Sequence, residues 1–290
     1  MPDATHAGGF PAPAKLNLFL HVTGRRPDGY HLLDSLVAFT DYGDTVQAAP
    51  SDTLSLELSG GFAGGLSAEP DNLVLRAARL LAEAAGVPAQ AALHLTKRLP
   101  IAAGIGGGSA DAAATLRALA ALWRIDLPTG ELAKLALSLG ADVPACLLGQ
   151  PCRMTGIGET LTPLPALPAL PVLLVNPGLP LSTPAVFKAR QPGFSAPAPA
   201  AIPDTTSELI AFLHAQRNDL TAAATGLLPD IADILAILPG LPGCLLSRMS
   251  GSGPTCFALM QDGESAAAAA RSLARSHPGW WVVPTSLRRL

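Results

Sequence analysis

Hydrophobic residues recur along the chain with two periods, and each period predicts a different element. Residues 16–22 are almost continuously apolar, which is typical of a buried strand. Leu54, Leu56 and Leu58 alternate with polar residues, and Leu93 and Leu95 repeat that alternation, so both segments are predicted to be half-buried strands. Shorter apolar runs at 172–175, 256–260 and 280–283 predict three further strands.

Apolar residues spaced three to four apart predict five helices. Residues 72–85 follow Asp71 and end before Gly86, a residue that commonly terminates helices. Helices are also predicted at 109–123, at 129–139 behind a Thr129 cap, and at 207–224 and 264–276. Strands grouped early among helices indicate an α+β fold of two lobes. We place the domains at residues 1–155 and 156–290.

One long uncharged stretch, residues 160–187, is of a length that could cross a membrane. It holds seven prolines, each of which interrupts helical hydrogen bonding, so we interpret it as a crossover containing the strand at 172–175. The N-terminus lacks the apolar core of a signal peptide. Residues 191–203 are rich in Pro, Gly, Ser and Ala and are predicted to be a loop. We expect a cytoplasmic protein without a membrane partner.

The composition excludes several classes of protein. Hydrophobic residues make up 49% of the 290 residues and the net charge is −3, which is unlike a disordered chain or a protein that binds nucleic acid through phosphates. The four cysteines form no CxxC motif and the six histidines form no HExxH motif, so no zinc site is expected.

The most informative segment is PIAAGIGGGSADAAA, which begins at Pro100. Four glycines precede a helix, and backbone N–H groups at such a helix start bind anions, most often phosphate. Ser109 is predicted either to cap the helix or to bind a phosphate oxygen. The segment is neither a Walker loop nor a Rossmann fingerprint, and a turn without a ligand stays an alternative. Lys97 and Arg98 add positive charge, or are simply solvated cations.

Two further segments carry candidate catalytic groups. Lys15 and Asn17 alternate with leucines on the first strand and therefore share one face. A lysine on such a strand suits stabilisation of a phosphoryl transition state, unless it only reaches solvent at the strand end. Asp142 lies in the apolar segment GADVPAC, where a carboxylate has a cationic partner, a catalytic task or a capping role.

Aromatic and glycine-rich turns supply candidate binding groups. The turn signal Pro-Asp-Gly presents Tyr30 and His31 together, so a flat base could stack on the tyrosine while the imidazole bonds its edge. A hairpin with a core tyrosine is the alternative. The segment MSGSGPT, which begins at Met249, either closes over phosphates or is a plain β-turn.

Taken together, these segments resemble the GHMP kinases, named for galactokinase, homoserine kinase, mevalonate kinase and phosphomevalonate kinase. PIAAGIGGGSADAA is similar to the central motif of that superfamily. PAKLNLFLHVTGRRPDGYHLLDSL, GADVPACL and MSGSGPTCFAL resemble the branch that acts on a cytidine diphosphate derivative of methylerythritol.

The resemblance implies a two-lobed α+β fold with the active site in the cleft between the lobes. It implies transfer of the γ-phosphate of ATP to the 2-hydroxyl of the methylerythritol moiety, a step in isoprenoid precursor synthesis. Asp142 would be the general base, and Lys15 would keep it ionised and stabilise the transferring group.

The resemblance also implies binding residues. The cytosine would stack between Tyr30 and Phe187 and bond His31, with Asn17 and Thr183 at the methylerythritol end and Lys188 at the nucleotide end. ATP would contact the following residues: Asn72 near the adenine, Lys97, and Pro100, Ile101, Ala102, Ala103, Gly104, Ile105, Gly106, Gly107, Gly108, Ser109 and Ala110 at the phosphates.

Magnesium is expected with ATP, although the sequence leaves its protein ligands open and only Ser109 is a candidate. Cytidine diphosphate methylerythritol and ATP are the expected partners of a monomer or homodimer. Another GHMP kinase specificity, or a nucleotide-binding module without catalysis, remains an alternative.

Overall fold

The computed structural model describes residues 9–66, 71–164 and 167–288. Contacts between residues divide the chain into two compact units that are interleaved in sequence. Unit 1 comprises residues 1–14, 43–101 and 106–149, and unit 2 comprises residues 15–42, 102–105 and 150–290. The compact units therefore do not follow a single cut of the chain, and the sequential domains 1–155 and 156–290 stay a prediction.

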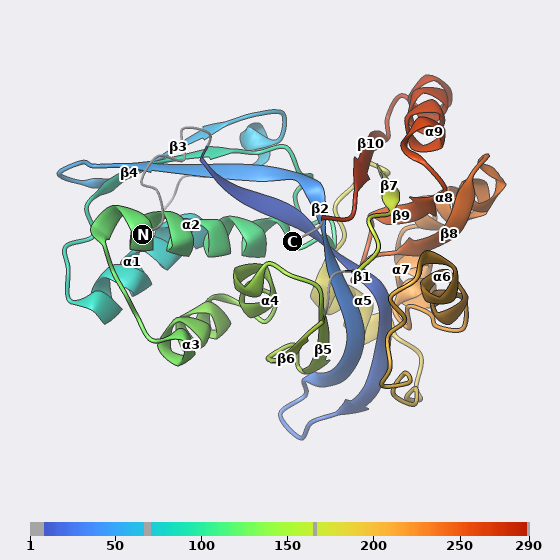
Figure 1. The fold of residues 1–290 in the computed structure, drawn as a ribbon, viewed down its shortest axis with the longest axis horizontal. Coiled ribbons are helices and arrows are strands. Elements are labelled where there is room, and N and C mark those ends of the chain that lie inside the picture. Colours follow the sequence, from blue (N-terminus) through green and yellow to red (C-terminus); the bar gives the residue numbers. More distant parts are fainter. Residues whose placement is uncertain (1–8, 67–70, 165–166, 289–290) are drawn as a thin grey trace. The chain divides into compact units, whose positions relative to one another are not determined.

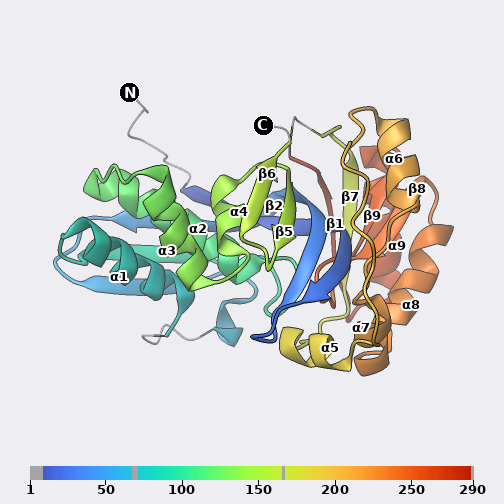
Figure 2. The ribbon, with the colours of Figure 1, turned by 90° about the horizontal axis from the view of Figure 1, so that it is seen from below.

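Unit 1 combines a small sheet with helices. Within it, β3 (Leu54–Ser59) runs parallel to β4 (Ala91–Thr96), and β4 pairs antiparallel with residues 45–49 of β2 (His31–Ala49). The helices α1 (Leu73–Ala85), α2 (Gly107–Trp123), α3 (Thr129–Leu139) and α4 (Val143–Leu148) complete the unit. The first two pack against each other, and α2 also contacts α4, as Figures 1 and 2 show. A short 3-10 turn, η1 (Ala63–Gly65), follows β3.

Unit 2 contains the rest of β2 and a second sheet. β1 (Phe10–Arg25) pairs with β2, and β2 pairs with β5 (Cys152–Gly156), which pairs with β6 (Thr160–Pro163). The second sheet has the order β10 (Trp281–Ser286), β7 (Pro171–Asn176), β9 (Cys256–Met260) and β8 (Cys244–Met249), and its pairs are antiparallel.

Helices of unit 2 pack on this second sheet. α8 (Asp230–Ile237) contacts β8 and β9, while α9 (Gly263–Ser276) contacts β7 and β10 (Figure 1). α5 (Thr183–Ala189), α6 (Thr206–His214), α7 (Thr221–Leu227) and the 3-10 turn η2 (Leu238–Gly240) complete the unit. Apolar side chains of α5, α7, α8, α9 and η2 share one core with residues of β1, β7 and β9.

Most sequence predictions of elements are confirmed, and two helices need correction. The helix predicted at 207–224 is broken between α6 and α7 because the Asn218 amide group donates to the carbonyls of Met249 and Gly251. The helix after the glycine-rich loop begins at Gly107, and no side chain caps it, so the predicted Ser109 cap is wrong. Residues 191–203 contain no helix or strand, as predicted. The sequence pattern did not reveal β2, β5, β6, β8, α5 or α8.

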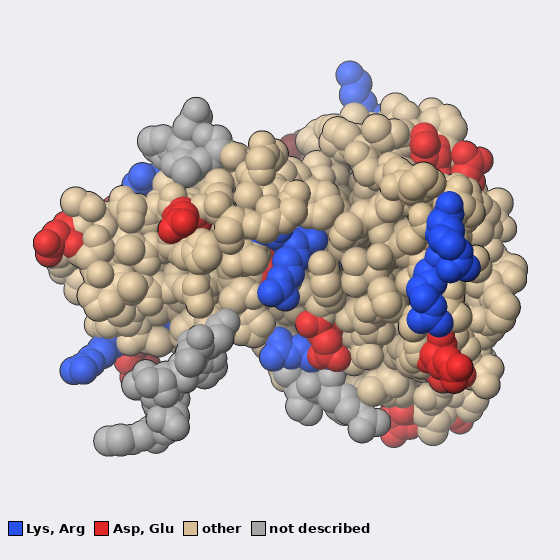
Figure 3. Space-filling view, turned by 90° about the horizontal axis from the view of Figure 1, so that it is seen from above, with Lys and Arg blue, Asp and Glu red and all other residues tan. Residues whose placement is uncertain are grey.

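The surface agrees with the low charge content. Charged residues are 14% of the chain, and the face in Figure 3 is mostly uncharged. No helix among the described residues has both the length and the apolar character to cross a membrane.

Candidate active site

The glycine-rich loop turns sharply into α2. Gly104 and Gly106 have φ of 71° and 65°, in the left-handed region that glycine adopts without a steric cost. Ala102 has φ of 51° and adopts the same region despite its Cβ. The backbone N–H groups at the start of α2 have no helical partner, so this segment has the features of an anion site.

Three sequence motifs meet around the loop within unit 2. The carbonyl of Ile105 accepts a hydrogen bond from the Lys15 backbone N–H at 2.9 Å. The carbonyl of Ala103 accepts one from the Thr255 N–H at 3.1 Å, and that of Gly104 accepts one from the Ser250 hydroxyl at 3.2 Å. The first strand, the loop and the MSGSGPT turn, which the sequence marked separately, therefore form one assembly.

Gly104 lies so close to the backbone of Gly253 that it has no space for a side chain. A Cβ on Gly104 would lie 2.4 Å from the Gly253 carbonyl oxygen. A Cβ on Gly251 would lie 2.6 Å from the Gly104 carbonyl oxygen. The glycines of the two turns thus permit backbone-to-backbone packing.

Lys15 and Asn17 lie on the same buried segment of β1, as the alternation predicted. The Asn17 amide group donates to the Ser35 hydroxyl at 2.7 Å, and its backbone N–H donates to the Ser250 hydroxyl at 3.1 Å. Ser35 in turn donates to the Phe19 carbonyl. Asn17 therefore joins β1 to β2 and to the MSGSGPT turn, and its contact with a substrate stays a prediction.

Asp142 lies in unit 1, directly before α4. It occupies the N-cap position, yet its side chain makes no capping hydrogen bond, so the alternative that Asp142 caps this helix is wrong. Arg117 of α2 donates to the carbonyls of Cys146 and Leu147 at the other end of α4, which fixes α4 against α2. The pairing of Asp142 with Lys15, a residue of unit 2, stays a prediction.

Two of the residues predicted for the cytosine site, His31 and Phe187, lie together within unit 2, and the stacking of a base between Tyr30 and Phe187 stays a prediction. The rings of His31 on β2 and Phe187 on α5 stack with centroids 5.0 Å apart and an interplanar angle of 27°. Tyr30 is 60% exposed, at the end of a turn closed by a hydrogen bond from the Arg26 N–H to the Tyr30 carbonyl. The predicted turn is confirmed, and Tyr30 is not a core residue.

Burial and two nearby cations favour the neutral form of His31. Burial lowers the pKa of His31, and the nearby charges of Arg190 and Arg25 lower it further. A neutral imidazole carries one donor and one acceptor nitrogen, which suits recognition of a base edge.

The other predicted binding residues are spread over both units. Thr183 and Lys188 lie on α5, and the Thr183 hydroxyl lies 2.7 Å from the hydroxyl of Ser252 in the MSGSGPT turn. Asn72 caps α1 by accepting a hydrogen bond from the Val74 N–H, so the cap is one residue later than Asp71. An adenine contact of Asn72 stays a prediction.

Lys97 lies in surroundings that differ from those predicted for it. It was expected to add positive charge at the phosphates or to be solvated, but its side chain is only 2% exposed. The ammonium group is paired with Asp44 and Asp111 in unit 1. No pattern in the sequence selects either aspartate, although Asp111 is the one acidic residue of α2.

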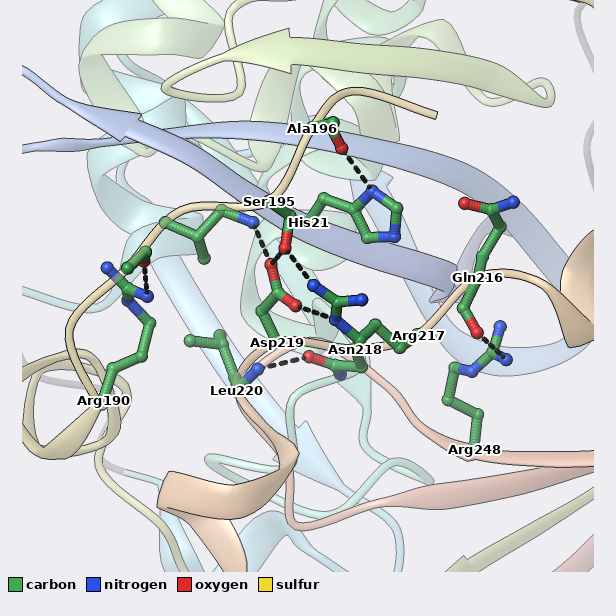
Figure 4. A network of polar contacts seen from close by, with 12 residues as sticks. His21, Arg190, Ser195, Ala196, Gln216, Arg217, Asn218, Asp219, Leu220 and Arg248 are labelled. Carbon is green, nitrogen blue, oxygen red and sulfur yellow. Dashed lines mark hydrogen bonds and ion pairs between the residues drawn. The ribbon is translucent and has the colours of Figure 1, made fainter. Parts of the chain in front are cut away.

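A polar network lies beside residues 191–203, and the sequence pattern did not indicate it. Asp219 accepts hydrogen bonds from the Val22 N–H and the Ser195 hydroxyl and pairs with Arg217 at 2.7 Å (Figure 4). Burial opposes the charge of Asp219, but these bonds outweigh it and lower the pKa of the carboxyl. The His21 ring bonds the Ala196 carbonyl, so the segment is attached to β1 at two places. A pocket of about 280 Å³ lies between Arg190 and this network.

Among the described residues, no group of three or more His, Cys, Asp or Glu side chains is placed to hold a metal ion. The four cysteines are free thiols.

Comparison with known proteins identifies the family. The family model for the GHMP kinases N terminal domain matches residues 72–150, and that for the GHMP kinases C terminal region matches residues 201–279. The 4-diphosphocytidyl-2-C-methyl-D-erythritol kinase of Paramagnetospirillum magneticum is 54% identical over 277 residues, which are 95% of this chain and 97% of that protein. The kinase of the same name from Paracoccus denitrificans is 57% identical over 278 residues, 95% of either chain.

Solved structures of GHMP kinases share the fold of this chain. A crystal structure of 4-(cytidine 5'-diphospho)-2C-methyl-D-erythritol kinase matches with a TM-score of 0.76 and 38% identity, over 96% of this chain and 98% of that one. A homoserine kinase from Cytophaga hutchinsonii matches with a TM-score of 0.71 over 96% of this chain and 93% of that one, but at 19% identity it supports the fold alone. The predicted α+β GHMP kinase fold is confirmed, and the chain belongs to the 4-diphosphocytidyl-2-C-methyl-D-erythritol kinase family of GHMP kinases.

Proposed function

We propose that this protein transfers the γ-phosphate of ATP to the 2-hydroxyl of 4-diphosphocytidyl-2-C-methyl-D-erythritol. The observation that carries the proposal is the identity of 54% and 57% to relatives of that name, over nearly the full length of each chain. The assembly of Lys15, the glycine-rich loop and the MSGSGPT turn supports it, because phosphoryl transfer depends on fixed groups around the phosphates.

Asp142 and Lys15 are the proposed catalytic pair. Asp142 accepts the proton of the attacking hydroxyl, which makes the oxygen a better nucleophile. Lys15 supplies a fixed positive charge that stabilises the negative charge of the transferring group. The position of Lys15 is fixed because its backbone N–H is bonded to the Ile105 carbonyl of the loop.

The aromatic site is proposed to hold the cytidine. His31 and Phe187 already lie against each other, and the exposed ring of Tyr30 is accessible for stacking. A cytosine edge presents both donor and acceptor atoms, which a neutral His31 can match. Specificity would then depend on the base, which homoserine and mevalonate lack.

The loop residues 100–110 are proposed to hold the ATP phosphates through their backbone N–H groups. Magnesium, when bound with ATP, neutralises charge on the phosphoryl oxygens. The Ser109 hydroxyl, inside the first turn of α2, is an oxygen ligand of the kind that this cation prefers. We further propose that the enzyme acts in the cytoplasm on these small molecules alone, as a monomer or homodimer.

A substrate panel tests the proposed function. Purified protein is incubated with ATP, magnesium and one of three alcohols: the cytidine diphosphate compound, homoserine or mevalonate. We expect ADP and a phosphorylated product with the cytidine compound only. Turnover of homoserine or mevalonate instead would move the protein to another specificity, and ATP binding without any transfer would indicate a non-catalytic module.

A further inference from the structure

A buried cluster of charges lies beneath the start of α2. The Lys97 ammonium group forms a close ion pair with Asp44 and a second one with Asp111, in which Nζ and Oδ2 are 2.7 Å apart. The three side chains are 2%, 0% and 4% exposed, respectively. Lys97 follows β4 directly, Asp44 lies on β2, and Asp111 lies on α2. The cluster therefore links three elements of unit 1 that lie far apart in sequence.

Asp44 fixes the segment that leads into the glycine-rich loop. Its Oδ1 atom accepts hydrogen bonds from the backbone N–H groups of Arg98 and Leu99, at 2.5 and 2.8 Å. Its other oxygen is occupied by Lys97. One carboxylate thus holds both the lysine side chain and the backbone that follows it.

Lys97 also lies directly against the backbone at the start of α2. A Cβ placed on Gly107 would lie 3.2 Å from Lys97 Nζ and 3.7 Å from the Leu99 side chain. The ammonium group is therefore packed under the first residue of the helix. With 2% of the side chain exposed, there is no surface on which a phosphate could reach it.

The cluster holds two carboxylates and one ammonium group, so one carboxylate lacks a full counter-charge. Asp111 is the less well satisfied of the two. Its Oδ1 atom is buried without a hydrogen-bond partner. Burial raises the pKa of Asp111 to about 7, Asp44 adds to that shift, and Lys97 opposes it. Burial would lower the pKa of Lys97, but Asp111 and Asp44 outweigh it and raise that pKa. The positive charge of Lys97 is therefore neutralised by these two ion pairs inside the protein.

We propose that Lys97 is a positioning residue for ATP: through Asp111 and Asp44 it sets the position of the first turn of α2, whose backbone N–H groups face the phosphates, and it does not bind the phosphates itself. The inference rests on the proposed function only in so far as ATP is the nucleotide at this loop. It replaces the direct phosphate contact that the sequence predicted for Lys97.

The two roles of Lys97 predict opposite effects of changing Asp111. If Lys97 positions α2, then Asp111→Ala removes the link to the helix and weakens ATP binding, whereas Asp111→Asn keeps an oxygen that accepts from Lys97. If Lys97 binds phosphate directly, then either change removes a competing negative charge, and ATP binds as well as before or more tightly.

The experiment measures binding of a non-hydrolysable ATP analogue by calorimetry, with magnesium present and without the alcohol substrate. We expect Asp111→Ala to raise the Kd about tenfold and Asp111→Asn to change it less than threefold. An unchanged or lower Kd for Asp111→Ala, or an equal rise for both variants, would overturn the proposal. Because no alcohol is present, the result is independent of which alcohol the enzyme phosphorylates.

Asp111→Asn covers the case in which Asp111→Ala does not fold. It keeps an oxygen acceptor for Lys97 and removes one of the two negative charges beside the ammonium group, while Asp44 stays in place. Positioning predicts a Kd within about threefold of the wild type. A Kd lowered tenfold or more would show that the freed lysine attracts the phosphates, which would refute the positioning role. We also expect the KM of Asp111→Ala for the cytidine substrate to stay within twofold of the wild type. That result would show that the substitution affects ATP binding and not the fold as a whole.

Discussion

Substitution of Gly104 by alanine tests whether the two glycine turns of unit 2 depend on direct backbone packing. An alanine here has a left-handed φ of 71°, which costs about 1–2 kcal/mol for a residue with a Cβ. The new Cβ would also lie 2.4 Å from the Gly253 carbonyl oxygen and 2.8 Å from its N and C atoms. Because all three atoms are backbone, no rotamer relieves the overlap, and overpacking of this kind costs about 1–3 kcal/mol.

The expected loss in free energy of unfolding is therefore about 2–5 kcal/mol. Gly226→Ala in α7 is the matched control in the same unit, because a Cβ there meets no atom within 4 Å. It should stabilise the protein by about 0.5–1 kcal/mol, since glycine is unfavourable inside a helix. Urea unfolding of both variants measures the difference. A Gly104→Ala protein as stable as the wild type would refute the close packing of the two turns.

Three further predictions address chemistry, recognition and pH. Asp142→Asn should lower kcat at least about 100-fold and leave the Kd for ATP unchanged, as for loss of a general base; near-normal turnover would refute the assignment. Tyr30→Ala should weaken binding of the cytidine substrate by about 1–3 kcal/mol, measured as a higher KM with the KM for ATP unchanged. Because the pKa of Asp111 is raised to about 7, the folded protein binds more protons than the unfolded chain between about pH 4 and pH 7. The free energy of unfolding should fall as pH rises through this window, and Asp111→Asn should reduce that fall; equal pH dependence in both proteins would contradict it.

Much of the fold could be predicted from the sequence where the signal is local. The helix α1 follows from apolar spacing and from Gly86, which adopts the left-handed conformation expected at a helix end. The break between α6 and α7 could not be predicted, because it depends on Asn218 bonding carbonyls that lie 31 and 33 residues away. The spacing of apolar residues along the chain does not indicate hydrogen-bond partners that lie so far apart.

The candidate site also has parts that the sequence predicts and parts that depend on contacts between distant residues. Gly104, Lys15 and the MSGSGPT turn could each be selected, since glycines before a helix and a lysine on an apolar strand are unusual in themselves. Their contact through backbone hydrogen bonds appears only in three dimensions. The ion pairs of Lys97 also depend on residues that lie far from it in the sequence. A lysine beside a phosphate loop suggests a phosphate ligand, but Asp44 and Asp111, at 53 and 14 residues from it, neutralise its charge inside the protein.

The product of the reaction tests the central claim most directly. The C2 atom of 2-C-methylerythritol carries a methyl group and no hydrogen, so a phosphate on its oxygen has no three-bond coupling to a proton. After incubation of the cytidine substrate with ATP and magnesium, we predict one new phosphomonoester singlet in the proton-coupled phosphorus NMR spectrum, formed in equal amount with ADP. A new phosphomonoester signal split by protons into a doublet or triplet, or inorganic phosphate in place of a phosphoester, would contradict transfer to the 2-hydroxyl.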